Sequence, residues 1–328
     1  MRYATLGRSG LQVAPLCLGA MNFGTSGGVA GCDEAEARRI VDAYLDAGGN
    51  MIDTADMYAA GESERIVGAA IRGRRDQVVL ATKAYMPTGV GPNDRGLSRG
   101  HLTRALEASL RRLGTDHVDL YQCHQWDPRT PIEETMATLD GFVRAGKVRY
   151  LGCSNFSAAQ IVEAQWAADR AHTTPFISNQ AEYSLITRTA EAEIVPVGER
   201  HGLGVLAWSP LGGGVLTGKY VPGGDADPDS RIARLYAMPT AAAHTWADGM
   251  LAERNLAIAG HVVAAAEELG ATPVAVALAW LRQRPGVASV VIGPRSTGQL
   301  AGNLAALDLT LPAPIADRLD EASHPAKI

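Results

Sequence analysis

The sequence has few cysteines and no clustered histidines, which bears on redox state and on metal binding. Its four cysteines, Cys17, Cys32, Cys123 and Cys153, show no C-x-x-C spacing. We expect reduced thiols in a cytoplasmic protein. The eight histidines are scattered, without an H-x-x-x-H pair or a mixed cluster with cysteine. The sequence therefore indicates no metal site.

Long apolar runs and clusters of positive charge are also missing. The 328 residues carry 30 Lys+Arg against 35 Asp+Glu, a net charge of −5 without any basic run, which argues against nucleic acid as a partner. No stretch approaches membrane-spanning length, and residues 1–12 contain no apolar signal core. We therefore expect neither a membrane segment nor a secretory leader. With 46% hydrophobic and 20% charged residues, the chain is expected to bury a large core.

Short apolar segments alternate with helical patterns along the chain. Residues 3–6 and 11–13, joined by Gly7-Arg8-Ser9-Gly10, predict a β-hairpin. Segments rich in Val, Ile and Leu predict eight further strands, at residues 16–18, 51–53, 78–81, 118–121, 148–153, 176–179, 205–208 and 290–292. Apolar residues at helical spacing lie between them. Such strands are buried on both faces, which implies parallel pairing with helices outside.

Capping residues mark the expected starts of several helices. A side chain that accepts from the backbone, with a Glu or Gln three residues later, is typical of a helix N-terminus. The candidates are Asp33 with Glu36, Ser157 with Gln160, Ser296 with Gln299, Thr272 before Pro273, and Thr130-Pro131 with Glu133.

These repeats predict an α/β fold of one domain over residues 1–328. Eight strand–helix units match a (β/α)8 TIM barrel, here with an N-terminal β-hairpin and long loops at the C-terminal face. A doubly wound sheet is the alternative, but no G-x-G-x-x-G follows the first strand. The long loops, residues 84–97 and 212–256, are expected to be lids or specificity walls. Disorder is an equally good explanation for the acidic stretch 223–230.

Four polar residues are expected to meet at one side of the barrel mouth. The active site of this fold lies at the C-terminal ends of its strands. Asp53 ends the second strand, Lys83 follows the third and His124 follows the fourth, while Tyr58 lies on the loop after Asp53. Considered alone, Asp53 would more simply cap the next helix and Tyr58 pack against a neighbour. Neighbouring strands, however, bring all four side chains together.

The chemistry of this cluster suits the reduction of a carbonyl group. A lysine near a tyrosine stabilises the phenolate, so Lys83 is expected to lower the Tyr58 pKa from its ordinary value of about 10. Asp53 would keep Lys83 charged and oriented. His124 would hydrogen-bond the same oxygen that Tyr58 protonates. No metal ligands and no acyl-transfer nucleophile compete with this interpretation.

The other side of the mouth offers contacts for a nicotinamide. Trp208, at the end of the seventh strand, can stack on the ring, and Ser154, Asn155 and Gln180 can bind its carboxamide. Each of these residues alone has a reasonable structural explanation. Their joint placement at strand ends is harder to explain by packing.

Two further segments suit the phosphates of a dinucleotide. Ser209-Pro210-Leu211 precedes three glycines, among them Gly213, so the backbone there could approach a pyrophosphate closely. Gly293-Pro294-Arg295-Ser296 forms the last strand-to-helix turn, where a helix N-terminus favours an anion. Arg295, with Lys219 and Arg231, would favour the 2′-phosphate of NADP over NAD.

Motifs along nearly the whole chain carry a family resemblance. They are LGAMNFG at 18–24, DTADMY at 53–58, ATK at 81–83, DLYQCHQWD at 119–127, GCSNF at 152–156, NQAEYS at 179–184, WSPLGGGVLTGKY at 208–220 and IGPRSTGQLAGN at 292–303. In order and spacing they resemble the aldo-keto reductase superfamily. The TGKY segment and the tryptophan on the seventh strand look closer to its bacterial and channel-β-subunit-like members.

The resemblance implies a role for each matching position. The catalytic group looks like Asp53, Tyr58, Lys83 and His124, and the nicotinamide contacts look like Ser154, Asn155, Gln180 and Trp208. The implied diphosphate and adenosine contacts are Ser209, Leu211, Gly213, Lys219, Gly293, Arg295, Gln299 and Asn303.

We therefore expect an NADPH-dependent oxidoreductase that reduces an aldehyde or ketone to an alcohol, reversibly. A non-catalytic, cofactor-sensing interaction protein of the same fold is the alternative. Phe23, Tyr85, Met86 and Trp126 lie near the expected mouth and indicate a partly aromatic pocket. Such a pocket fits aldehydes, ketones, quinones, keto-sugars or steroids about equally. The sequence leaves the substrate and the oligomeric state open.

Overall fold

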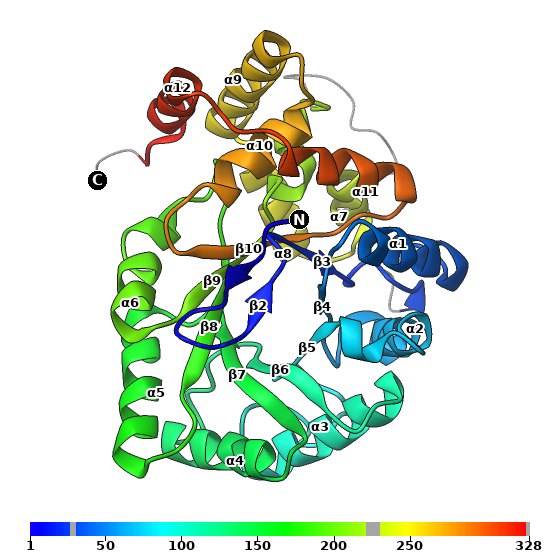
Figure 1. The fold of residues 1–328 in the computed structure, drawn as a ribbon, viewed down its shortest axis with the longest axis vertical. Helices are drawn as coiled ribbons and strands as arrows, with labels where there is room; N and C mark the ends of the chain where they lie inside the picture. The colour runs from blue at the N-terminus through cyan, green and yellow to red at the C-terminus, as the bar shows by residue number, and fades with distance from the viewer. Residues whose placement is uncertain (27–30, 221–229, 326–328) are drawn as a thin grey trace.

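Eight parallel strands form a closed barrel at the centre of the molecule (Figure 1). The structure is a computed structural model, and it describes residues 1–26, 31–220 and 230–325. The barrel strands are β3 Leu16–Gly19, β4 Met51–Asp53, β5 Val79–Ala84, β6 Val118–Cys123, β7 Val148–Ser154, β8 Phe176–Glu182, β9 Gly204–Trp208 and β10 Val287–Ile292. Each strand pairs with its neighbours in the chain, and β10 pairs with both β9 and β3. The predicted (β/α)8 TIM barrel is confirmed.

Helices surround the barrel on its outer side (Figure 1). They are α1 Glu34–Asp46, α2 Glu62–Ala70, α3 Arg99–Leu113, α4 Ile132–Arg144, α5 Ala158–Ala171, α6 Ile194–His201, α9 Glu253–Leu269, α10 Pro273–Arg282 and α11 Thr297–Leu304. Their buried residues recur at helical spacing, as Ile40, Val41 and Tyr44 do in α1. The apolar side chains of each helix therefore pack on the outward-facing side chains of the strands.

The capping predictions were confirmed at four helices and wrong at one. Asp33, Ser157, Thr272 and Ser296 each accept a backbone hydrogen bond from the third residue after them. Thr130 does not cap α4, which begins at Ile132 after Pro131. Its hydroxyl instead donates to Asp127 Oδ2 at 2.8 Å. That carboxylate also accepts from the Leu97 N–H at 2.8 Å, so Thr130 helps to join two loops at the mouth.

Several predicted strands are longer in the structure, and in β5 and β8 this changes where polar residues lie. β5 continues to Ala84, so Lys83 lies inside the strand rather than after it. β8 continues to Glu182, so Asn179 and Gln180 are strand residues as well. The apolar pattern stops earlier because the barrel interior near the mouth is lined by polar side chains.

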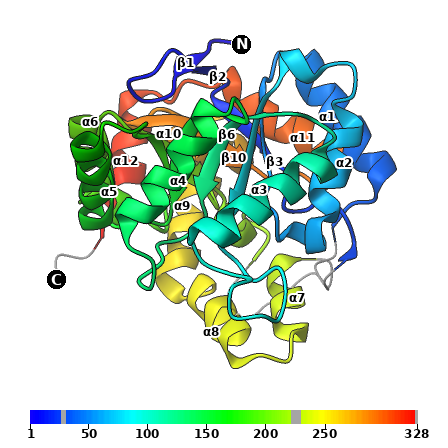
Figure 2. The ribbon, with the colours of Figure 1, turned by 90° about the horizontal axis from the view of Figure 1, so that it is seen from below.

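The N-terminal hairpin covers the end of the barrel that is opposite to the mouth. β1 Ala4–Thr5 and β2 Gln12–Val13 pair antiparallel, as predicted. Leu6 and Val13 are fully buried and belong to one apolar cluster with interior residues of seven barrel strands, namely Cys17, Met51, Ala81, Leu120, Ile177, Leu206 and Ala288. Figure 2 shows the hairpin at one end and the helices α7 and α8 at the other. One end of the barrel is thereby sealed, which leaves the C-terminal ends of the strands for function.

The segment 212–256 is more regular than the long loop predicted for it. It contains the 3-10 helix η5 Gly212–Thr217 and the helices α7 Arg231–Ala237 and α8 Ala241–Met250, and α9 already begins at Glu253. Most of the acidic stretch 223–230 lies outside the described residues. A last helix that the sequence did not indicate, α12 Ala313–Ser323, packs on α9. The remaining 3-10 helices are η2 Tyr58–Gly61, η3 Arg75–Gln77, η4 Thr189–Glu191 and η6 Ala305–Leu307.

Candidate membrane spans were few among the described helices. None of them alone is both long and apolar enough to cross a bilayer. Only α9 and α10 together meet that length and composition, and the pair is bent by 101° at the break between them.

Gly68 offers a test of how closely α2 and α3 pack. A Cβ atom at Gly68 would lie 2.2 Å from the carbonyl oxygen of Leu113, so the helices must separate to accept one. We expect Gly68→Ala to lower the free energy of unfolding by about 1–3 kcal/mol, as overpacking usually does, measured by urea denaturation. The matched control is Gly260→Ala in α9, where nothing lies within 4 Å of the added atom. Equal effects of the two substitutions would contradict the close approach.

Candidate active site

Lys83 is the centre of the polar cluster at the barrel mouth. Its ammonium group donates to Asp53 Oδ2 at 2.6 Å, to the Thr54 carbonyl at 2.8 Å and to the Tyr58 hydroxyl at 3.2 Å. These three bonds use all three donors of the ammonium group. The Lys83 side chain is fully buried and that of Asp53 is 2% exposed. The structure thus brings Asp53, Lys83 and Tyr58 together as the sequence predicts.

The other oxygen of Asp53 is held by two amides from across the barrel. Gln122 on β6 and Gln180 on β8 each donate to Asp53 Oδ1 at 3.0 Å. Every side of this carboxylate is therefore hydrogen-bonded, which is the condition under which a buried ion pair is tolerated. One hydrogen of the Gln180 side-chain amide is engaged here, so its other hydrogen and its side-chain oxygen remain for a ligand. The sequence analysis did not identify Gln122, since one glutamine inside an apolar strand carries no recognisable pattern.

Tyr58 is positioned by a tight and strained turn. Ala59 and Ala60, directly after it, have φ angles of 46° and 53°, a left-handed conformation that costs non-glycine residues about 1–3 kcal/mol. On its other side the Tyr58 ring meets His124 edge-on, with ring centroids 5.9 Å apart. Strain of this kind persists where surrounding contacts hold the backbone, so the turn defines where the phenol lies.

The pKa values of Lys83 and Tyr58 are both raised, and only the shift of Tyr58 differs from the expectation. Burial alone would lower the pKa of Lys83, but the charge of Asp53 and the hydrogen bonds to Asp53 and Tyr58 raise it above its ordinary value. For Tyr58, burial raises the pKa more than the Lys83 charge lowers it. The expected lowering of the Tyr58 pKa is therefore wrong for this structure. Tyr58 keeps its proton at neutral pH and is a donor.

His124 is a neutral imidazole in this site. Burial, together with the positive charge of Lys83, lowers its pKa to about 3. Its backbone N–H donates to the Ala84 carbonyl at 3.0 Å, and its own carbonyl accepts from the Asn155 side chain at 3.0 Å. A neutral imidazole carries one donor and one acceptor, so it can orient a carbonyl oxygen without competing for the proton of Tyr58.

Asn155 links the residues predicted to contact a nicotinamide. Its amide nitrogen also donates to Ser154 Oγ at 3.1 Å, and its amide oxygen accepts from the Trp208 indole at 3.1 Å. The Ser154 hydroxyl in turn donates to the backbone carbonyl of Gln180 at 2.9 Å. Both Asn155 and Ser209 adopt left-handed φ angles, 58° and 56°. Ser154, Asn155, Gln180 and Trp208 therefore form one connected group along the ends of β7, β8 and β9.

The segment after β9 is a glycine turn that few other residues could form. Gly212, Gly213 and Gly214 have φ angles of 54°, 63° and 98°, all in the region that favours glycine. Trp246 of α8 packs close to Gly213, 3.2 Å from where a Cβ would lie. Lys219 reaches back to Gly214, whose added Cβ would lie 3.0 Å from the lysine side chain. Pro210 and Leu211 lead into this turn, as predicted.

Arg231 lies near the glycine turn that follows β9. Its guanidinium stacks on Trp246, 5.3 Å from the ring centroid, and Trp246 packs close to Gly213. The groups that interact with it electrostatically are Tyr58, Glu182 and Tyr220. The structure thus places Arg231 close to the turn predicted to bind a pyrophosphate and to Tyr58 at the barrel mouth.

The turn before α11 holds the remaining predicted cofactor residues. Asn22 donates to the Gly293 carbonyl at 2.8 Å, and the Arg295 N–H donates to Gln299 Oε1 at 2.9 Å. Asn303 is buried, one turn further along α11. An acid that the sequence did not indicate also lies here, since Glu36 accepts the Thr297 N–H at 2.7 Å. One of the first N–H groups of α11 is therefore already occupied by a carboxylate.

Of the residues predicted to contact a substrate, Phe23 must be corrected. Its side chain is fully buried in the main core, and its backbone bridges Cys32, so it has no surface to offer a substrate. Tyr85 is 8% exposed, with Arg95 over its ring at 5.9 Å. Trp126 is half-buried and packs edge-on against Phe156, with ring centroids 5.3 Å apart. Tyr85 and Trp126 thus follow β5 and β6 at the mouth end.

Asp56, between Asp53 and Tyr58, is a buried acid to which the sequence analysis assigned no role. It is 3% exposed, and neither carboxyl oxygen receives a side-chain hydrogen bond within the described residues. Burial, assisted by the charge of Glu64 and opposed by that of Arg112, raises its pKa to about 7. Its N–H donates to the Lys83 carbonyl at 3.0 Å. The backbone of Asp56 therefore anchors the loop that carries Tyr58. Its carboxyl group is half protonated near neutral pH.

All four cysteines are free and buried, and burial raises the pKa of Cys123 and Cys153 above the ordinary thiol value. Within the described residues, no group of three or more His, Cys, Asp or Glu side chains is arranged to hold a metal ion.

Known proteins resemble this chain over nearly its whole length. The sequence model of the Aldo/keto reductase family matches residues 15–324. A Bacillus subtilis protein named uncharacterized oxidoreductase YrpG is 40% identical, over 98% of this chain and 95% of its own. A probable voltage-gated potassium channel subunit beta of Oryza sativa subsp. japonica is also 40% identical, over 94% and 92%. A putative subunit of the same name from Schizosaccharomyces pombe is 33% identical, over 96% and 91%.

The raised pKa of Asp56 can be tested through protein stability. The folded protein holds the Asp56 proton more tightly than the unfolded chain does. The wild type therefore loses stability as pH rises from the ordinary carboxyl pKa, about 4, to about 7. Asp56→Asn removes this loss, so we expect its Tm to exceed that of the wild type by a margin that grows to a few degrees by about pH 7. Asp317→Asn on exposed α12 is the control. A margin that stays constant between about pH 5 and pH 8 would show that Asp56 has an ordinary pKa.

Proposed function

The chain belongs to the aldo/keto reductase family, and on that basis we propose that it is an NADPH-dependent oxidoreductase. In this proposal it reduces an aldehyde or ketone to an alcohol, reversibly. The observation that supports it most directly is the chain of contacts from Asp53 through Lys83 to the Tyr58 hydroxyl, at 2.6 and 3.2 Å. A buried, protonated phenol held by an ammonium group is a proton donor of fixed position, which is what an alkoxide formed at the mouth requires.

Each member of the cluster has a distinct task in this proposal. Tyr58 gives its proton to the carbonyl oxygen, and the Lys83 charge stabilises the phenolate that remains. Asp53 keeps Lys83 charged and directed at Tyr58. His124, neutral at working pH, donates a hydrogen bond that orients the substrate oxygen. Tyr85 and Trp126 would contribute to an apolar wall for the rest of the substrate.

The residues opposite this cluster fit a nicotinamide dinucleotide. NADPH, when bound, supplies the hydride that the carbonyl carbon receives. Trp208 would stack on the ring, and Ser154, Asn155 and Gln180 would hold the carboxamide. The observation that supports the fit is the run of three left-handed glycines at Gly212, Gly213 and Gly214, because residues without side chains let a diphosphate approach the backbone closely. The N–H groups of Gly212 and Gly214 themselves donate within the turn. Ser209, Pro210, Leu211 and Lys219 border this turn.

We assign the adenosine end of the cofactor to the α11 turn. Gly293, Gln299 and Asn303 would contact it, and Arg295 would bind the 2′-phosphate that distinguishes NADPH from NADH. Arg231 interacts electrostatically with Tyr58, and a part for it in binding this phosphate stays a prediction. Glu36 at the first turn of α11 opposes a second negative charge there, so Arg295 would be the main attraction for the phosphate.

A second function is supported by the relatives named as potassium channel β subunits. In this alternative the chain binds the same cofactor but acts as an interaction subunit of a channel-like assembly, without turnover. The cofactor residues cannot distinguish the two functions. The filled positions Asp53, Tyr58, Lys83 and His124 favour the enzyme. The cytoplasmic location and the organisation as one domain stay predictions.

The first test of the enzyme is the proton donor. We expect Tyr58→Phe to bind NADPH as the wild type does but to lose about 10²–10⁴-fold in turnover, the usual contribution of a general acid, in an absorbance assay with a panel of aldehydes and ketones. Tyr3→Phe, at an exposed position, is the control. Full activity of Tyr58→Phe would refute the donor assignment. A wild type that binds NADPH but oxidises it with no member of the panel would support the interaction subunit instead.

The second test concerns the preference for NADPH. We expect Arg295→Ala to weaken NADPH binding about tenfold or more, as loss of a charge-assisted contact does, and to leave NADH nearly unchanged. Titration of tryptophan fluorescence measures both. Glu36→Gln is the matched variant with the opposite expected effect. Removal of this negative charge should strengthen the binding of NADPH and leave that of NADH unchanged. Equal losses for NADPH and NADH in Arg295→Ala would mean that Arg295 does not contact the 2′-phosphate.

A further inference from the structure

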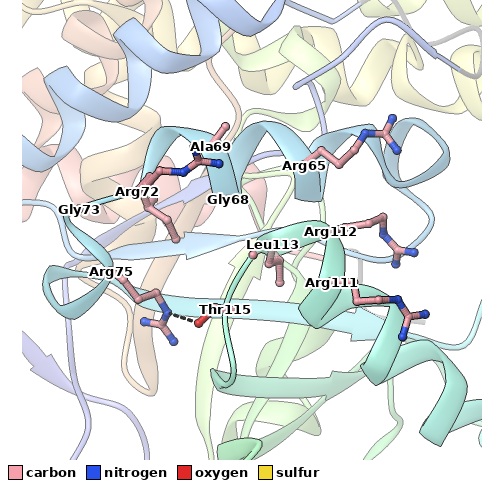
Figure 3. A pocket seen from close by; sticks show the side chains of 12 residues that line it. Arg65, Gly68, Ala69, Arg72, Gly73, Arg75, Arg111, Arg112, Leu113 and Thr115 are labelled. Atoms are coloured by element: carbon pink, nitrogen blue, oxygen red, sulfur yellow. Dashed lines mark hydrogen bonds between the residues drawn. The ribbon is translucent and has the colours of Figure 1, made fainter.

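A hollow lined by arginines lies between α2 and α3, on the outer wall of the barrel (Figure 3). Its volume is about 380 Å³, within the range of pockets for small ligands. Arg65 comes from α2, Arg72 lies two residues after that helix, Arg75 comes from η3, and Arg111 and Arg112 come from α3. No Asp or Glu is among the described residues that line it. This concentration of positive charge stands out in a chain whose net charge is −5.

Two of these arginines are held in place by the protein itself. Arg75 pairs with Asp119 at 2.7 Å and also donates to the carbonyls of Val78 and His117. Arg112 pairs with buried Glu64 at 2.6 Å. These contacts hold each guanidinium, so both arginines are ordered before any ligand arrives. They provide a rigid floor for the hollow, and Asp119 and Glu64 balance their charge.

The other three arginines have no such partners. Arg65, Arg72 and Arg111 are exposed, and within the described residues none of them makes a hydrogen bond or an ion pair. Figure 3 shows Arg65 and Arg72 on the α2 side and Arg111 on the α3 side, with Gly68 and Leu113 between them. Arg65 interacts electrostatically with Glu62, whereas among the described residues no acid interacts in this way with Arg72 or Arg111. Like charges gathered in this way repel one another, and a bound anion would relieve that repulsion.

Small residues leave the space between the arginines open. Gly73 and Gly114 lie at the ends of α2 and α3, and nothing is found within 4 Å of where a Cβ would be on either. Gly68 lets the two helices touch, so their arginines start from adjacent backbones. A ligand could therefore contact arginines from both helices at once.

From this arrangement we propose that the hollow is a binding site for a small anion with two or more linked phosphate groups. Guanidinium groups match phosphate bidentately, and arginines on two facing helices require more than one anionic group to engage both. The site is separate from the barrel mouth, where Lys83 and Tyr58 lie, and does not depend on the reductase proposal. A nucleoside polyphosphate and an inorganic polyphosphate share this chemistry.

Titration calorimetry with inorganic pyrophosphate, at low ionic strength and with the complete chain, tests the proposal. We expect binding by the wild type, and at least about tenfold weaker binding by the double variant Arg72→Ala/Arg111→Ala, since each lost charge-assisted contact costs about that factor. The matched control is Arg38→Ala/Arg318→Ala, which removes two exposed arginines from other helices. Its affinity should equal that of the wild type. ATP in place of pyrophosphate distinguishes a nucleotide, if it binds more tightly, from an inorganic ligand.

Pyrophosphate could also bind at the α11 turn, so Arg295→Ala is included. Loss of binding in Arg295→Ala, with full binding in the Arg72/Arg111 double variant, would overturn the proposal. So would equal losses in the double variant and its control, which would indicate only general attraction to positive charge. Absence of binding by the wild type at millimolar pyrophosphate would overturn it as well. Circular dichroism of each variant separates these outcomes from loss of the fold.

Discussion

The ion pair between Asp53 and Lys83 is the interaction on which the arrangement of the barrel mouth depends. It joins neighbouring strands in a nearly solvent-free interior, where two charges are tolerated only with close geometry and additional hydrogen bonds. Gln122 and Gln180 provide those bonds from two other strands. Removing one partner of such a pair typically costs about 3–5 kcal/mol, because the other charge stays buried alone. Lys83 of this pair also donates a hydrogen bond to the phenol of Tyr58. The same contact therefore supports both the structure and the proposed chemistry.

Much of the fold could be predicted because a barrel of this kind has a repeated strand–helix pattern in its sequence. Buried parallel strands are short apolar runs, and the order of eight such runs with helices between them leaves few other architectures. The same logic predicts from the sequence that Asp53, Lys83 and His124 lie at the ends of adjacent strands. Side chains that follow neighbouring strands must lie near one another, whatever the details of the loops.

What could not be predicted depends on burial and on contacts between distant segments. A motif shows that Lys83 lies near Tyr58, but only three-dimensional packing reveals that burial outweighs the lysine charge at the phenol. Asp56 lies in the motif between Asp53 and Tyr58. Its raised pKa, however, comes from burial and from the charge of Glu64 on α2, which the motif does not show. Phe23 lies in a sequence motif that was expected near the mouth, but its side chain is buried in the core. The helices α7 and α8 lie in a stretch whose glycines and prolines resemble a loop.

The closure of the barrel has a consequence for how the chain folds during synthesis. β3 pairs with β10, so that Leu16 lies opposite Val290. One edge of β3 therefore stays unpaired until almost the whole chain has left the ribosome, and an open apolar edge is prone to pair with other chains. Contacts between such distant segments also form slowly. A nascent chain of this protein would thus depend on chaperones to shield its early strands, and a chain cut before β10 would aggregate rather than form a smaller barrel.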